Sequence, residues 1–145
     1  METSHERPHV YVDVNVFIYP ILYDPTEIPE ANGAKIFLHK IIANEVAAHT
    51  SLLSWDEFVW VLRKQINPEF ATEKGLDFLA FPNLTFESVT LETINYAQDL
   101  IGLHAIKPRD AIHLATAMLR NLTEIVTFDN DLDKISTIHA APPGD

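Results

Sequence analysis

The chain has no cysteine, only four glycines, and few basic residues. The lack of cysteine excludes disulfides and thiolate metal sites and fits a reducing compartment. No apolar run approaches the roughly 20 residues that a membrane helix needs. The polar N-terminus, METSHERPH, lacks the apolar core of a signal peptide. We therefore expect a cytoplasmic protein that does not enter a membrane.

The shortage of basic residues sets the charge: 10 Lys and Arg oppose 21 Asp and Glu, for a formal net charge of −11. This balance argues against a protein that holds polyanions through a basic patch. It leaves room for an enzyme that acts on nucleic acid, because clustered carboxylates can hold cations and those cations can meet the phosphates.

The pattern along the 145 residues predicts one domain, 1–145, with loose tails at 1–8 and 141–145. Short apolar segments alternate with amphipathic helical patterns. Strands are expected at 9–13, 47–53, 84–89 and 124–128, with a fifth at 136–140. This alternation predicts an α/β fold, a three-layer α/β/α sandwich with a mostly parallel central sheet. In such sheets, ligands bind beyond the carboxyl ends of the strands.

Two acids carry competing interpretations in the first half of the chain. Asp13 interrupts the apolar stretch VYVDVNVFIY, where it either caps the next helix or is delivered to a site by the strand. Glu57 forms an S-x-x-E capping box with Ser54, and that interpretation is preferred when the motif is taken alone.

Two more acids follow in the second half. Asp110 lies in the first turn of an apolar helix, where a carboxylate offsets the helix dipole. Asp129, in VTFDNDLD, fits a turn. The sequence from Asp129 does not fit an EF-hand calcium loop. The sixth position of that loop requires glycine but is Lys134, and the twelfth requires glutamate but is Ala140.

The four acids together are harder to explain than each alone. Three of them follow strands, and Asp110 begins a helix that can point to the same sheet edge. Carboxylates gathered at one edge would repel and take up protons. One or two divalent cations would remove that repulsion, and oxygen ligands favour Mg²⁺ or Mn²⁺ over Zn²⁺.

Four segments resemble, in order and spacing, the acidic motifs of PIN-domain ribonucleases, and the length resembles VapC-type toxins. The segments are VYVDVNVFIY, SLLSWDEFVWVL, PRDAIHLATAML and IVTFDNDLD. The resemblance spans about residues 10–138. It implies a Mg²⁺- or Mn²⁺-dependent endoribonuclease, usually dimeric and often inhibited by a cognate antitoxin protein.

The resemblance also implies roles for individual residues. The catalytic, metal-binding acids would be Asp13, Glu57, Asp110 and Asp129. The supporting residues would be Asn15, Thr127 and, as an auxiliary acid, Asp131.

Two neighbours of Asp110 also have two interpretations each. Arg109 is the best candidate for a phosphate contact in the RNA substrate. The alternative interpretation is a solvated arginine at the end of a helix. His113 shares a helical face with Asp110, and we interpret it as a packed, hydrogen-bonded histidine rather than an acid–base group.

Other classes fit less well. A haloacid dehalogenase phosphatase and a D-x-E exonuclease both need an acid where Asn15 stands. A receiver domain would need a lysine after a late strand. A housekeeping RNA-processing nuclease and a catalytically silent PIN-fold scaffold remain alternatives. A homodimer is expected, because Phe58, Trp60 and Phe81 suggest aromatic surface to be covered.

Overall fold

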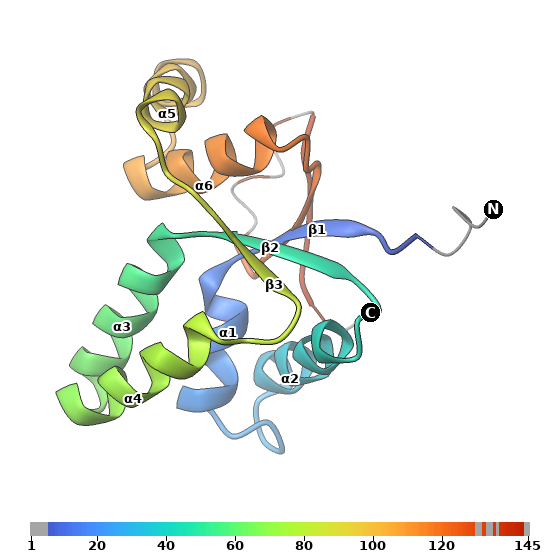
Figure 1. The fold of residues 1–145 in the computed structure, drawn as a ribbon, viewed down its shortest axis with the longest axis vertical. Helices are drawn as coiled ribbons and strands as arrows, with labels where there is room; N and C mark the ends of the chain where they lie inside the picture. Colours follow the sequence, from blue (N-terminus) through green and yellow to red (C-terminus); the bar gives the residue numbers. More distant parts are fainter. Residues whose placement is uncertain (1–5, 130–131, 133–134, 136, 144–145) are drawn as a thin grey trace.

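A five-stranded parallel sheet organises the computed structural model, which describes residues 6–129, 132, 135 and 137–143 (Figure 1). The strand order is β3-β2-β1-β4-β5, and all four neighbouring pairs are parallel. The strands are β1 (His9–Val12), β2 (Ala47–Ser51), β3 (Leu84–Glu87), β4 (Glu124–Val126) and β5 (His139–Ala141). The helices are α1 (Val14–Leu22), α2 (Pro29–Ile42), α3 (Leu53–Gln65), α4 (Pro68–Leu79), α5 (Leu91–His104) and α6 (Pro108–Leu119).

The helices form two layers around the sheet, as the α/β/α prediction required. Helices α1 to α4 cover one face and α5 with α6 the other (Figure 1). Strand β1 shows how alternation builds both cores. Val10 and Val12 join the core under α1 to α4, whereas Tyr11 joins the core under α5 and α6.

The topology reverses beside β1. From β1 the chain builds outward through β2 to β3, and then crosses back over the opposite face to β4 on the other side of β1. The carboxyl ends of β1 and β4 therefore flank the switch point of the sheet, where α/β folds place their ligands. The acids predicted after β1 and β4 are adjacent for this reason.

Proline and capping residues set several helix starts. Proline is the first residue of α2, α4 and α6, where its missing N–H has no cost. The side chain of Asn67 accepts a hydrogen bond from the amide of Phe70 at the start of α4. Thr90 and Thr93 form a reciprocal capping box at α5.

The capping box predicted for Ser54 and Glu57 is wrong. Helix α3 begins at Leu53, and the amide of Leu53 donates to Ser51 Oγ at 3.0 Å. Ser54 is fully buried, with its hydroxyl 2.6 Å from that of Thr50. Since Thr50 donates to the Val12 carbonyl, Ser54 donates to Thr50 and pins the helix to the sheet.

Two smaller expectations also need correction. Ala141, assigned to a loose tail, belongs to β5, and its carbonyl accepts from the amide of Thr127 at 2.9 Å. Phe58, expected at an aromatic surface, is only 3% exposed, because it stacks on Phe78 in the core. Trp60 does remain on the surface. In the described part of the chain, no helix has the length and apolar character to cross a membrane.

Candidate active site

Asp13 is fixed at the carboxyl end of β1 by its neighbours on β4. Its amide donates to the Val126 carbonyl at 2.9 Å. It occupies the N-cap position of α1, but its side chain makes no regular capping bond. Instead, Thr127 Oγ1 donates to Asp13 Oδ2 at 2.9 Å, and the Asp129 amide donates to Thr127 Oγ1 at 3.0 Å. Thr127 thus ties the turn carrying Asp129 to Asp13.

A small pocket of about 30 Å³ opens at this point of the sheet. That volume is close to the space of one water molecule in the liquid, so it suits an ion or a water rather than a nucleotide. Three predicted acids, Asp13, Asp110 and Asp129, line it together. The complete lining is Tyr11, Asp13, Asp110, His113, Ile125, Thr127, Asp129 and Leu132.

Glu57 reaches the site through His113. Oε1 of Glu57 lies 2.6 Å from Nε2 of His113, and Nδ1 of His113 is hydrogen-bonded to the hydroxyl of Tyr11. An ionised carboxylate only accepts, so Nε2 carries the hydrogen. In the neutral ring, Nδ1 then accepts from Tyr11. The buried chain Tyr11–His113–Glu57 therefore runs from β1 through α6 to α3, and His113 is the hydrogen-bonded histidine that the sequence suggested.

The electrostatics of the pocket disfavour further negative charge. Burial raises the pKa of the Asp13 carboxyl above its ordinary value, and the charge of Glu57 raises it further. The hydrogen bond from Thr127 lowers this pKa, as does the positive charge of His113 when its ring is protonated. Burial also raises the pKa of Tyr11 well above its usual range, with Asp13 adding to the effect. A carboxylate held in this way gains from a nearby cation.

The donor chemistry of the pocket suits a hard cation, because carboxylate oxygens are what Mg²⁺ and Mn²⁺ prefer. The described residues do not form a finished ligand set: no group of three or more His, Asp or Glu side chains among them is placed to hold one metal ion. Glu57, engaged by His113, would have to turn for all four acids to converge.

Asn15 and Arg109 do not line this pocket. Asn15 is exposed, and its backbone amide, rather than its side chain, lowers the pKa of Asp13 slightly. Arg109 is exposed on the first turn of α6 and does not line the pocket. Asp131 lies outside the described residues.

Tyr11 is the site residue that the sequence reasoning missed. It stands two positions before Asp13, whose backbone continues the extended course of β1, so the two-residue period of a strand places both on one side. An almost fully buried tyrosine needs a hydrogen-bond partner, and here His113 is that partner. The signal was present, but only the tertiary structure supplies the partner.

The fold and the pocket define a class: a parallel α/β domain with acids at the carboxyl edge of its switch point. The sequence profile of the PIN domain matches residues 10–138. This chain belongs to the PIN domain family.

Solved structures share the fold. The toxin–antitoxin complex from Klebsiella pneumoniae has 21% identity and a TM-score of 0.65, covering 90% of this chain and 95% of that one. VapBC2 from Rickettsia felis, bound to a promoter DNA fragment, has 16% identity and a TM-score of 0.67, covering 91% and 96%. VapC20 of Mycobacterium tuberculosis, a toxin that cleaves the sarcin-ricin loop, has 15% identity and a TM-score of 0.69, covering 88% and 95%. No curated protein matches the chain.

Proposed function

We propose that this chain is a metal-dependent endoribonuclease that hydrolyses RNA phosphodiester bonds, and that it is the toxin of a toxin–antitoxin pair. One observation carries the proposal: Asp13, Asp110 and Asp129, from three distant parts of the sequence, line one pocket at the switch point of the sheet. Glu57 stands one hydrogen-bonded residue away. The toxin activity of similarly folded proteins supports the assignment.

The residues divide the work as follows. Asp13, Asp110 and Asp129 would hold Mg²⁺ or Mn²⁺, with Glu57 completing the set after it turns from His113. The ion, when bound, would supply positive charge for the phosphate and favour ionisation of a nearby water. Until it turns, Glu57 is held by His113, so this hydrogen bond keeps the fourth acid close to the other three. Arg109, on the exposed first turn of α6, would contact a neighbouring phosphate.

The direct test is cleavage of tRNA and other structured RNAs with Mg²⁺, Mn²⁺ or EDTA. We expect metal-dependent cutting by the wild type and a loss of at least about a hundredfold in Asp13→Asn and Asp110→Asn. Asp99→Asn is the matched control, since Asp99 is an exposed acid on α5. Equal cutting by all four proteins would reveal a contaminating nuclease and contradict the proposal.

One observation favours a second candidate, the catalytically silent scaffold. Glu57 is engaged by His113, and no three described donors are placed for an ion. Calorimetric titration with Mn²⁺ separates the two candidates. Binding that is lost in Asp13→Asn supports the nuclease, whereas no binding and no cleavage by the wild type would support the scaffold.

The antitoxin would dock on the layer formed by α1 to α4, on the other face of the sheet from α5 and α6. An apolar pocket of about 240 Å³ opens between α1, α2, α3 and α4, and it suits the apolar face of a partner helix. Its lining is Phe17, Pro20, Ile21, Leu38, Phe58, Lys74, Asp77, Phe78 and Phe81.

Induced expression distinguishes a toxin from a housekeeping nuclease. A toxin should arrest growth, and co-expression of the protein encoded by the neighbouring gene should relieve the arrest. Ile21→Glu should abolish relief while leaving the arrest. Leu103→Glu, on the exposed side of α5, should leave both unchanged. Expression without growth arrest would favour the housekeeping role.

A further inference from the structure

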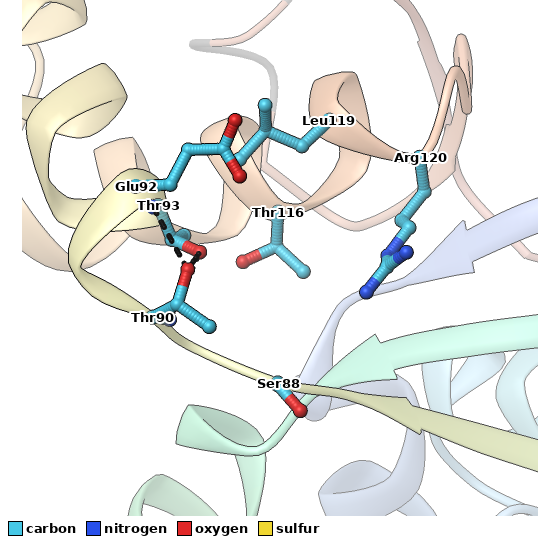
Figure 2. A pocket seen from close by; sticks show the side chains of 7 residues that line it. All are labelled: Ser88, Thr90, Glu92, Thr93, Thr116, Leu119 and Arg120. Carbon is cyan, nitrogen blue, oxygen red and sulfur yellow. Dashed lines mark hydrogen bonds between the residues drawn. The ribbon is translucent and has the colours of Figure 1, made fainter.

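A further pocket, larger than the one lined by the acids, lies toward the later turns of α6 and over the carboxyl end of β3 (Figure 2). It encloses about 150 Å³, room for one planar base but not for a whole nucleotide. It is formed by the segment after β3, the first turn of α5 and the later turns of α6. The lining is Ser88, Thr90, Glu92, Thr93, Thr116, Leu119 and Arg120.

Arg120 is held in place at one side of this pocket. Its Nε donates to Glu87 Oε1 at 2.9 Å, and the other carboxylate oxygen of Glu87 lies 2.7 Å from His49 Nδ1. Glu87 is only 8% exposed. A guanidinium has five N–H donors in a fixed fork, and this ion pair uses one. The remaining donors are therefore oriented before any ligand arrives.

Glu92 and Arg120 lie on opposite sides of the pocket, with Thr116 between them (Figure 2). Glu92 contributes acceptor oxygens and Arg120 contributes donors. Thr116 uses its hydroxyl hydrogen on the Ile112 carbonyl, 2.7 Å away, so toward a ligand its oxygen can only accept. Leu119 supplies an apolar wall. The pocket thus fits a flat ligand with acceptors at one edge and donors at the other.

Among nucleobases, guanine matches this arrangement best. It presents two acceptors, N7 and O6, and beside them the donors N1–H and N2–H. Arginine to O6 and N7 is the commonest specific base contact in complexes with nucleic acid, and a carboxylate accepts from base N–H groups. Adenine offers one group of each kind along its corresponding edges, and uracil has a single donor. Cytosine has two acceptors and an amino donor, but it carries them on one edge, whereas Arg120 and Glu92 face each other across the pocket. All three bases would therefore satisfy the pair less completely.

Two independent estimates place this pocket close to the acids. Thr116 follows Asp110 by six residues on α6, about 9 Å along the helix. Strand β3 lies two strands from β1 in the sheet, about 10 Å across. One or two nucleotides of an RNA chain span such a distance.

We propose that this pocket binds a guanine base of the RNA substrate, one or two nucleotides from the bond that is cut. The base pairs with Arg120 through O6 and N7 and with Glu92 through its N–H groups. This inference rests on the proposed function, because it names the sequence that the nuclease selects. It gives an acidic protein a means of choosing RNA that does not depend on a basic surface.

The test is cleavage of a randomised RNA pool, with sequencing of the cut ends. We expect the wild type to enrich guanine at one fixed position within two nucleotides of the cut. Glu92→Gln and Arg120→Lys should each reduce that enrichment roughly 5- to 100-fold, the range of a bidentate base contact. Glu73→Gln, an exposed acid on α4, is the control and should retain the preference. A wild type that cuts without guanine preference near the cut overturns the proposal and leaves the nuclease standing.

A binding measurement keeps the pocket testable even if no RNA is cut. Guanosine should bind the wild type in an NMR titration, adenosine and uridine should bind at least about tenfold more weakly, and Glu92→Gln should lose the difference. Glu92 is exposed and outside the Glu87 network, so this variant should fold. Selective guanosine binding by a protein that cuts no RNA supports the pocket while the nuclease fails. Equal binding of the nucleosides, or none, overturns the base assignment.

Discussion

At the residue scale, the burial of the Asp13 carboxyl has a cost in folding stability. The carboxyl is buried against β4, and burial raises its pKa. The ionised form is therefore less favourable in the folded chain than in the unfolded one. Its partner Thr127 offsets only part of this effect. The acid that follows β1 thus lies at a site where a bound cation would stabilise its charge.

Asp13→Asn should stabilise the metal-free protein at neutral pH. With a folded pKa above the ordinary 3.8, the wild type loses stability as pH rises from 3.8 through the folded pKa, while the variant does not. The melting-temperature gain should therefore be present at pH 7 and vanish below about pH 3.8. Adding Mn²⁺ should raise the melting temperature of the wild type alone. A variant less stable than wild type at pH 7 would contradict this account.

Tyr11→Phe should destabilise the fold by about 1–3 kcal/mol, because it leaves the buried Nδ1 of His113 without its donor. Tyr96→Phe is the matched control. The hydroxyl of Tyr96 donates to Met118 Sδ, a weak acceptor, at 3.8 Å, so its loss should stay within about 0.5 kcal/mol. Urea unfolding of both variants measures the difference, and equal losses would show that the Tyr11–His113 bond contributes little.

At the scale of elements, two glycines show where helix packing requires a missing side chain and where it does not. Gly75 of α4 lies against α3: a Cβ there would stand 2.8 Å from Val59 Cγ2. Gly102 of α5 has nothing within 4 Å of the corresponding position. One glycine is required by close approach of two helices, and the other is an exposed position in a helix that any residue could fill.

Alanine should therefore act in opposite directions at the two glycines. Gly102→Ala should stabilise by about 0.5–1 kcal/mol through helix propensity and a less flexible unfolded chain. Gly75→Ala gains the same propensity, but overpacking against Val59 should exceed it and give a net loss on the order of 1 kcal/mol. Thermal unfolding of the two single variants tests this. Stabilisation of both would mean that α3 and α4 separate easily.

At the scale of the whole molecule, the net charge of −11 limits how RNA is held. The chain has only 10 Lys and Arg to meet the phosphates, so we expect few counterions to leave the RNA on binding. For single strands, the slope of log affinity against log salt is about −0.7 per phosphate neutralised. The proposed Arg109 contact and the proposed ion would together neutralise few phosphates, so the slope should be small.

The salt dependence can be measured with a 2′-O-methyl RNA, which resists cleavage. Its affinity is determined in Mg²⁺ at several KCl concentrations. We expect a slope shallower than about −2. Arg109→Gln should reduce it by roughly 0.7, whereas Lys40→Gln, on α2 in the other helical layer, should leave it unchanged. A slope near −5 would reveal a basic surface that the charge balance does not suggest.

Light scattering tests the expected homodimer, which the structure of one chain leaves as a prediction. Trp60 is 55% exposed on α3 and is one surface a second copy would cover. We expect twice the chain mass at micromolar concentration, and Trp60→Glu should reduce it if α3 forms the interface. A monomer at all concentrations would leave this surface to another partner.

Much of this protein is determined by its sequence, because its signals are local. Alternating apolar segments and helical periods are set by residues a few positions apart, so the α/β/α class and most element positions follow from them. The spacing of Asp13, Asp110 and Asp129 after strands or at a helix start also placed them at one sheet edge.

The tertiary structure decided what depends on residues far apart in the chain. Glu57 and Ser54 read as a local capping box, but Thr50 and His113 redirect both side chains. Tyr11 gains its role from a histidine 102 positions away. The pocket lined by Glu92 and Arg120 joins three separate segments of the chain. Hydrogen bonds between buried polar groups, whose partners only the folded chain brings within reach, decide these features.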